Sequence, residues 1–360
     1  MPKVLHVLRQ LEPGGIECWL LRLIETWPAA TRPEFHFALE STYPGSLAPA
    51  FQHLGARLHH CPSPRNLPLF AARFLQLLRQ EGPFQAVHCH THHASAFVLS
   101  LAACAAVPLR IAHSHANSNF VPASPLRHAY QHVSRLVLST VANHKLAVSQ
   151  AAAHDLFGPR HPGQALPCGL DWNRYLQPRP AAPAGRFNLV HVGRLAPEKN
   201  HAFLFRVFAG IAARSPEAQL FLVGDGPLRA SLEQQAVALG LAPRIHFLGQ
   251  RQDIPEILAE TDLFVFPSHH EGLGIAAIEA QAAGVPVLCA THLPPEITII
   301  PALVQRLALE LPIQQWVNTA MSMRTATAPS LQARAIQLES SGLALSKNIQ
   351  QLEALYYAHA

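Results

Sequence analysis

Two carboxylates, Glu271 and Glu279, stand eight residues apart in the segment 267–286, P-S-H-H-E-G-L-G-I-A-A-I-E-A-Q-A-A-G-V-P. An apolar run at 263–266 predicts a buried strand before them, and apolar residues at helical spacing predict a helix from Ile275 onward. Glu271 would then lie in the turn and Glu279 about one turn inside the helix. Both could accept hydrogen bonds from hydroxyls of one ligand, beside backbone N–H groups that suit an anion. The alternative is a helix start that favours acidic residues for electrostatic reasons, with Glu279 merely exposed.

Two cations, Arg194 and Lys199, follow a strand predicted at 187–192, in the pattern G-R-L-A-P-E-K-N. The carboxyl ends of strands are where α/β folds bind ligands. A diphosphate leaving group needs cations of this kind, especially without a metal. The alternative is a pair of surface cations in an ordinary loop.

Histidines recur in two further segments, A-V-H-C-H-T-H-H and R-I-A-H-S-H. On a strand, His88, His90 and His92 would share one face, and so would His113 and His115. Imidazole is a good zinc ligand, so the pattern allows a metal-dependent hydrolase. The chain shows no repeating strand–helix array that would supply the further ligands of such an enzyme, and a hydrolase would leave the Glu271–Glu279 segment unexplained.

The segment around Glu271 resembles the signature of glycosyltransferase family 4, the retaining nucleotide-sugar transferases. Its pattern of Glu, seven residues, Glu, an Ala-rich helix and Gly-x-Pro is met by Glu271, Glu279, Gly284 and Pro286. The form E-G-L-x-x-x-x-I-E-A-Q-A-A-G, together with R-I-x-H-S-H, is similar to the capsular and exopolysaccharide branch of that family. The resemblance covers nearly the whole chain.

The resemblance implies a donor site for a nucleotide-diphosphate sugar. The donor-binding residues that it implies are Gly15, Arg194, Lys199, Glu271, Gly272, Leu273, Gly274, Ile275 and Glu279. Arg194 and Lys199 are expected at the diphosphate. Glu271 is expected to orient the sugar, and Glu279 the ribose.

A catalytic set of His115, His113 and Glu271 is also implied, because a histidine at this strand end reaches the donor sugar in the family. The strand register leaves His115 and His113 both open for that role. Gly15, in the turn E-P-G-G-I-E, would let the backbone approach the phosphates closely.

The chain of 360 residues is long enough for two domains. The fold class is predicted as α/β, with the GT-B arrangement of two Rossmann-like domains facing across a cleft. We expect an acceptor-binding domain over 1–178, a Pro-rich linker over 179–185 and a nucleotide-sugar domain over 186–340. Spacing predicts helix from Leu331 to Ala360. The resemblance implies that its last part, 341–360, crosses back to the first domain.

Charge is unevenly distributed along the chain. Residues 1–180 hold 15 Lys and Arg against 8 Asp and Glu, whereas residues 181–360 hold 12 against 14. The basic half indicates an anionic partner, and we expect an anionic membrane surface rather than nucleic acid. An ordinary solvated basic surface is the equal alternative.

Six scattered cysteines without C-x-x-C favour free thiols in a reducing compartment. The start M-P-K-V-L-H-V-L has no signal-peptide pattern, and the apolar run 94–109 is too short to span a bilayer. The expected location is cytoplasmic, with peripheral contact at the inner membrane.

The resemblance, together with these patterns, implies a retaining hexosyltransferase. It would move a sugar, most readily from a UDP-sugar, to a glycan or lipid-linked acceptor in cell-surface polysaccharide biosynthesis. No cofactor and no metal are expected. The alternatives are the hydrolase above, a nucleotide-sugar epimerase of similar fold, and a non-catalytic sugar-binding protein.

Overall fold

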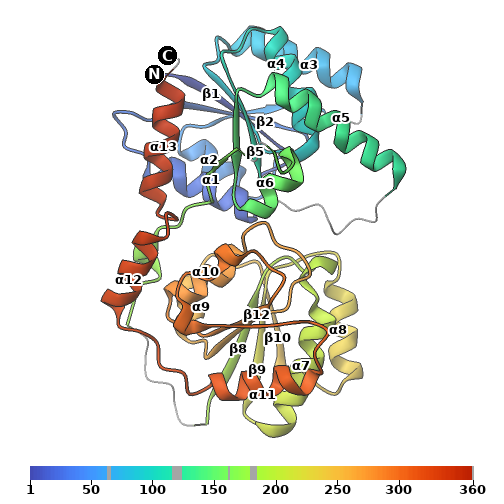
Figure 1. Cartoon of the computed structure of the whole chain (residues 1–360), viewed down its shortest axis with the longest axis vertical. Helices are drawn as coiled ribbons and strands as arrows, with labels where there is room; N and C mark the ends of the chain where they lie inside the picture. The colour runs from blue at the N-terminus through green and yellow to red at the C-terminus, as the bar shows by residue number, and fades with distance from the viewer. Residues whose placement is uncertain (63–65, 116–123, 161–162, 179–184, 359–360) are drawn as a thin grey trace. The chain divides into compact units, whose positions relative to one another are not determined.

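A computed structural model describes the chain except residues 63–65, 116–123, 161–162, 179–184 and 359–360. The chain forms two compact units (Figure 1). The first unit holds Met1–Gly169 and Leu345–Ala360, and the second holds Leu170–Ala344. The N-terminal segment of the first unit thus ends at Gly169, whereas the first domain was expected to end at residue 178. Most of the expected linker 179–185 lies outside the described residues.

The first unit is built on a parallel sheet of seven strands with the order β3-β2-β1-β4-β5-β6-β7. Its strands are β1 (Lys3–Leu8), β2 (Glu34–Leu39), β3 (Arg57–His60), β4 (Ala86–Cys89), β5 (Leu109–Ser114), β6 (His144–Ala147) and β7 (Gln164–Ala165). Its helices are α1 (Gly15–Thr26), α2 (Ala48–His53), α3 (Leu67–Glu81), η1 (His92–Ala94), α4 (Ser95–Cys104), α5 (Pro125–Val141), α6 (Gln150–Phe157) and α13 (Leu345–Tyr357). The repeating strand–helix order explains why the sheet is parallel.

The two faces of this sheet carry different side chains, because residues alternate along a strand. Val7 and Val87 face the apolar core formed with α3 and α4. His6 and His88 point to the opposite face, where both contact the ring of Tyr356 on α13. One face is therefore a hydrocarbon core, and the other holds a buried group of imidazoles.

The second unit has a parallel sheet of six strands with the order β10-β9-β8-β11-β12-β13. Its strands are β8 (Phe187–Val192), β9 (Ala218–Val223), β10 (Ile245–Gly249), β11 (Leu263–Phe266), β12 (Val287–Ala290) and β13 (Val304–Leu307). Its longer helices are α7 (His201–Arg214), α8 (Arg229–Ala238), α9 (Ile254–Ala259), α10 (Ile275–Ala282), α11 (Ile313–Met323) and α12 (Leu331–Ser340). Short 3₁₀ turns are η3 (Trp172–Arg174), η4 (Pro197–Lys199), η5 (Ala242–Arg244), η6 (Pro295–Ile297) and η7 (Pro301–Leu303).

Each sheet reverses its winding direction at one position. In the first unit β1 lies between β2 and β4, and in the second β8 lies between β9 and β11. The loop after β1 therefore leaves in the opposite direction to the loop after β4, and the loop after β8 in the opposite direction to the loop after β11. Open α/β sheets bind ligands at this kind of position.

The expectation of continuous helix from Leu331 to Ala360 is wrong. Helix α12 ends at Ser340 and α13 begins at Leu345. Gly342 between them has φ +77°, a left-handed conformation that glycine adopts without strain and that stops a helix. Helix α13 belongs to the first unit, where it contacts α1 (Figure 1).

Within the described residues, no helix combines the length and the apolar composition needed to cross a membrane.

Candidate functional site

An ion pair marks the winding reversal of the second sheet. Lys199, in the loop after β8, places its Nζ 2.7 Å from Oε1 of Glu271, in the loop after β11. The two side chains are only 16% and 10% exposed. The ammonium also lies 5.4 Å from the centre of the Phe266 ring, which favours a cation. The predicted cation and carboxylate are thus brought together, half-buried, where an α/β sheet binds ligands.

The loop that carries Lys199 is held closely against the loop after β9. The N–H of Gly193 donates to Val223 O at 2.9 Å, and the N–H of Leu195 donates to Asp225 O at 3.0 Å. A Cβ added to Gly224 would lie 2.1 Å from Gly193 O, and this residue has φ +128°. Only glycine allows the two backbones to approach this closely, so the loop is rigidly placed.

Two further hydrogen bonds join the Lys199 loop to the Glu271 loop. Asn200, in a left-handed conformation, donates from Nδ2 to Pro267 O at 3.1 Å. The His269 N–H donates to Glu198 O at 2.8 Å. These contacts fix the distance between the predicted diphosphate-binding loop and the predicted sugar-binding turn. Arg194 lies in the same loop, and its side chain is exposed.

The predicted turn Gly272–Ile275 leads directly into α10. Leu273 is buried, and Gly274 adopts φ +86° immediately before the first helical residue, Ile275. A Cβ on Gly274 would lie 2.6 Å from Ile297 Cδ1, so this glycine is needed both for its conformation and for space. The first N–H groups of α10 lie ahead of the intrahelical ladder, on the segment that carries Glu271.

Glu279 lies one turn inside α10, as predicted, and it is not a solvated surface carboxylate. It is half-buried, and its Oε1 accepts a hydrogen bond of 2.5 Å from the hydroxyl of Tyr175. Tyr175 is buried and follows the turn η3. No pattern in the sequence pointed to Tyr175, because its partner lies 104 positions away.

The first unit brings four of the predicted histidines together, with His6 of β1 added to them. His90 Nε2 lies 3.0 Å from His6 Nδ1, and His90 Nδ1 lies 2.8 Å from His115 Nε2. His88 Nε2 lies 3.2 Å from His113 Nδ1. Burial lowers the pKa of each of these rings well below its usual value, to about 3 for His6 and His113, and neighbouring imidazoles lower it further for His6, His88, His90 and His115. All five rings are therefore neutral at pH 7.

His92 does not share a strand face with His88 and His90. Strand β4 ends at Cys89, and His92 lies in η1 with φ +54°, so it cannot continue the alternation. Its Nε2 lies 2.9 Å from Asp155 Oδ2, on helix α6.

The grouped histidines could in principle hold a metal. In two triads, His6 with His88 and His90, and His90 with His113 and His115, the nearest nitrogens lie within 4.8 Å of one another. In the first triad the rings stack, with interplanar angles of 10° for His6 and His90 and 26° for His88 and His90, whereas the rings of the second triad are tilted by 39–40°. Stacked rings direct their lone pairs side by side rather than at one point, so this geometry favours hydrogen bonding between imidazoles over a metal centre.

His113 and His115 differ in how far they reach the surface. His113 is fully buried, and its Nε2 donates to Leu166 O at 2.9 Å. His115 follows the end of β5 and is half-buried. Of the two, His115 is the one with an exposed edge.

Gly15 is exposed and begins helix α1 at the carboxyl edge of the first sheet. A Cβ added to its neighbour Gly14 would lie 2.5 Å from Oε2 of Glu17, so this carboxylate turns back over the glycine turn. Burial raises the pKa of Glu17 to about 7. Sequence patterns did not single out this carboxyl.

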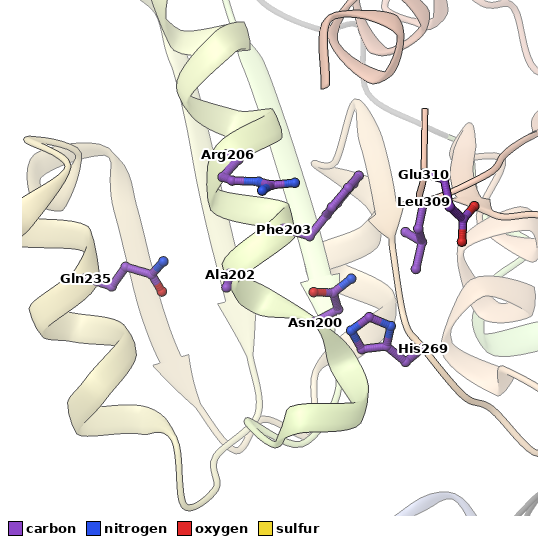
Figure 2. A pocket seen from close by; sticks show the side chains of 8 residues that line it. All are labelled: Asn200, Ala202, Phe203, Arg206, Gln235, His269, Leu309 and Glu310. Carbon is purple, nitrogen blue, oxygen red and sulfur yellow. The ribbon is translucent and has the colours of Figure 1, made fainter. Parts of the chain in front are cut away.

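A hollow of about 370 Å³ borders the ion pair's two loops in the second unit (Figure 2). Its lining comes from the start of α7, from α8, and from the loops that follow β11 and β13. The lining residues are Asn200, Ala202, Phe203, Arg206, Gln235, His269, Leu309 and Glu310. It shares Asn200 and His269 with the hydrogen bonds that join the Lys199 and Glu271 loops.

The described residues therefore place Arg194, Lys199, Glu271, Glu279 and the 272–275 turn in the second unit. Gly15, His113 and His115 lie in the first unit. Each group occupies the carboxyl edge of its own sheet.

Comparison with known proteins places this geometry among sugar-transferring enzymes. The sequence profile described as "Glycosyl transferases group 1" matches residues 176–310. Over 371 aligned positions the chain is 31% identical to the putative glycosyltransferase EpsF of Bacillus subtilis (strain 168), covering 98% of this chain and 96% of that one.

Solved structures share the fold over the full length. HepE of Anabaena, crystallised with UDP and glucose, superposes with a TM-score of 0.76 at 21% identity, covering 98% of both chains. WaaG, a glycosyltransferase involved in lipopolysaccharide biosynthesis, gives 0.73 at 19% identity, covering 98% of this chain and 99% of that one. These likenesses confirm the predicted two-domain α/β fold of the GT-B class.

Proposed function

The chain belongs to the group 1 family of glycosyltransferases, and we propose that it transfers a hexose with retention from a UDP-sugar to a glycan or lipid-linked acceptor. The observation that carries this proposal is the Lys199–Glu271 pair at the carboxyl edge of the second sheet. The complex of HepE with UDP and glucose supports UDP as the nucleotide. The fold shared with WaaG, a glycosyltransferase involved in lipopolysaccharide biosynthesis, supports a role in the synthesis of cell-surface polysaccharide. The hydrolase and epimerase alternatives are not favoured.

In the proposed reaction the acceptor hydroxyl attacks the anomeric carbon from the side on which the diphosphate leaves. The leaving phosphate takes the proton of the attacking hydroxyl. Arg194 and Lys199 stabilise the negative charge that grows on the diphosphate, without a metal. Such stabilisation is strongest at the transition state, where that charge is largest.

The remaining donor contacts follow from the same assignment. Glu271 accepts hydrogen bonds from sugar hydroxyls, and Glu279 accepts them from the ribose. His115, with His113 behind it, faces the sugar near the reacting carbon, and Gly15 lets the backbone approach the phosphates.

A donor screen tests the proposal directly. A nucleotide-sugar that binds only the folded chain raises its melting temperature. We expect UDP-glucose, UDP-galactose or UDP-N-acetylglucosamine to raise the melting temperature more than the GDP- and ADP-sugars do, and turnover to survive EDTA. No shift with any nucleotide-sugar, or loss of turnover in EDTA with rescue by Mn²⁺ or Zn²⁺, would contradict the proposal.

We also propose that the protein is cytoplasmic and binds the inner membrane peripherally through helix α5. Four apolar side chains of α5 are unusually exposed: Leu126 by 85%, Tyr130 by 53%, Val133 by 57% and Leu136 by 57%. The helix contains Arg127, His128, His132 and Arg135, and no Asp or Glu. An apolar stripe flanked by cationic groups, in the basic half of the chain, suits the boundary of an anionic bilayer.

A further inference from the structure

Four side chains of the first unit form a continuous row of hydrogen-bonding groups, which we call the first file. It begins at Cys168 and passes through His115 and His90 to His6. Cys168 Sγ lies 3.6 Å from His115 Nδ1, and His115 Nε2 lies 2.8 Å from His90 Nδ1. His90 Nε2 lies 3.0 Å from His6 Nδ1. Cys168, His90 and His6 are buried, and His115 is half-buried. His115 is therefore the most exposed member of this file among the described residues.

A second row of hydrogen-bonding groups, the second file, lies beside the first. The groups at its ends determine which atom of each pair donates the proton. The Tyr356 hydroxyl lies 2.8 Å from His88 Nδ1, His88 Nε2 lies 3.2 Å from His113 Nδ1, and His113 Nε2 lies 2.9 Å from Leu166 O. A carbonyl oxygen only accepts, so His113 carries its proton on Nε2. His88 must then donate from Nε2, and Tyr356 donates to His88.

The first file can run in only two directions, because each neutral imidazole has one N–H and one lone pair. In one direction the Cys168 thiol donates to His115 Nδ1, and every ring carries its proton on Nε2. In the other direction every ring carries its proton on Nδ1, and His115 donates to sulfur. Burial raises the pKa of Cys168, which therefore stays a thiol and can donate.

The surroundings at both ends of the first file favour the arrangement in which the Cys168 thiol donates to His115 Nδ1. Neutral sulfur is a poor acceptor, so a proton on His115 Nδ1 would have a weak partner, whereas His90 Nδ1 is a good acceptor for His115 Nε2. At the other end, His6 Nε2 meets no hydrogen-bond partner within the described part of the chain. The His6 ring stacks on Phe37 at an interplanar angle of 18° and lies perpendicular to Tyr356 at 85°, and the π face of a perpendicular ring attracts an N–H but not a lone pair.

We propose that His90 and His6 are positioning residues that hold His115 as the Nε2–H tautomer, so that His115 Nδ1 accepts a hydrogen bond from a ligand hydroxyl in the place now taken by the Cys168 thiol. The role as a ligand contact rests on the proposed transferase function. An acceptor nitrogen recognises a sugar hydroxyl and gives no hydrogen bond to a phosphate oxygen. His115 therefore selects for the sugar part of the donor and leaves the diphosphate to Arg194 and Lys199.

The tautomers can be measured without any substrate. In protein labelled with ¹⁵N-histidine, long-range ¹H–¹⁵N correlation spectra distinguish Nε2–H, Nδ1–H and doubly protonated rings. At pH 7 we expect His6, His88, His90, His113 and His115 as neutral Nε2–H tautomers. His191 is an internal reference of the opposite kind, since its Nδ1 donates to Val265 O at 2.9 Å. A His115 ring that is protonated on Nδ1, or on both nitrogens, would overturn the proposal.

Substitutions then separate positioning from mere packing. His90→Asn keeps an acceptor oxygen near the place of Nδ1, so His115 should stay an Nε2–H tautomer, and His90→Leu should turn it into a mixture. Tyr356→Phe breaks only the second file and is the matched control, for which the His115 signal should not move. Cys168→Ser retains a donor and should leave the tautomer unchanged. If His90→Leu leaves the His115 signal as in the wild type, His90 does not position it, and the wild-type spectrum remains decisive if a variant does not fold.

A titration with UDP-glucose distinguishes this inference from the transferase assignment. If the donor binds, its addition should shift His115 Nδ1 and release the Cys168 thiol, and UDP alone should not do so. Equal shifts with UDP and UDP-glucose would contradict the hydroxyl contact. Failure of the transferase assignment would instead appear as no binding of either compound, with the tautomers still as expected.

Discussion

Lys199 Nζ and Glu271 Oε1 lie 2.7 Å apart, although they are separated by 72 positions in the sequence. Each was predicted to touch a different part of the donor, the lysine the diphosphate and the glutamate the sugar. The two side chains neutralise each other in a half-buried site, where breaking a pair costs more than it does on the surface. A diphosphate must therefore compete with Glu271 for the ammonium.

This pairing changes what substitution should do. Lys199→Ala should weaken UDP binding by about tenfold to a hundredfold, since a hydrogen bond to a charged group contributes on the order of 1.5–3 kcal/mol. Glu271→Gln should leave UDP affinity unchanged or slightly higher, because it frees the ammonium, and should lower turnover, because its contact with the sugar is weakened. Isothermal titration with UDP and with the UDP-sugar, beside initial rates, measures both effects.

The matched control for this comparison is Arg214→Ala, which removes a cation from the other end of α7, where its Nη1 donates to Asn318. It should leave UDP affinity as in the wild type. If Glu271→Gln loses UDP as severely as Lys199→Ala does, the assigned division of roles is wrong.

The sequence predicted the local parts of this site but not their pairing. Strand, loop and helix periods located Lys199 and Glu271 on the loops after two buried strands. That these strands are neighbours follows from the sheet order β9-β8-β11, which depends on packing across the whole unit. Strand β3, Arg57–His60, was missed because its side chains are exposed or half-buried and show no apolar alternation.

The histidine patterns were only partly informative for a related reason. Alternation correctly grouped His88 with His90, and His113 with His115, but it could not show where β4 ends. His92 has a positive φ and contacts Asp155 on another element, and neither feature can be read from local alternation. His6 stands alone in an apolar strand, and only the β1–β4 pairing, with His6 opposite His88, brings it to the others.

Gly284, a residue of the family pattern, should be important for stability. It has φ +78°, and a Cβ there would lie 2.9 Å from Arg334 Nη1. Gly284→Ala should lower stability by about 1–2 kcal/mol for the left-handed conformation, plus the cost of displacing the buried guanidinium. Gly240→Ala is the matched control, with φ +68° and open space around the added methyl. Thermal or urea unfolding of both variants measures the difference, and equal losses would show that Arg334 does not restrict this position.

Glu17 should make stability depend on pH near neutrality. Its pKa is about 7 in the folded chain against 4.5 when solvated, so the folded state keeps the proton that the unfolded state loses. This stabilising contribution is full below pH 4.5 and is lost as pH rises through 7. Glu17→Gln, which stays neutral, should therefore raise the melting temperature relative to the wild type at pH 8 by several degrees, on the order of 3 kcal/mol, and not at pH 4.5.

The control for Glu17 is Glu25→Gln on the same helix, where the carboxylate is 51% exposed in a surface pair with Arg22. Its effect should be small at both pH values. Melting curves between pH 4.5 and 8.5 give the comparison, and a Glu17→Gln difference that does not grow with pH would mean that this carboxyl is not buried in solution.

Helix α5 should determine binding to anionic membranes. In cosedimentation with vesicles of phosphatidylglycerol and phosphatidylcholine, the wild type should bind at 50 mM salt. Its affinity for the vesicles should fall on the order of tenfold at 300 mM, because salt screens the attraction between the basic half of the chain and the anionic lipid. Leu126→Glu combined with Val133→Glu should remove most of the binding, since a carboxylate at these positions opposes both apolar insertion and charge attraction. Val237→Glu on α8 is the matched control, because Val237 is 67% exposed but lies in the acidic half of the chain. If the α8 variant loses as much binding as the α5 variant, or if the wild type ignores the vesicles at low salt, α5 is an ordinary solvated helix.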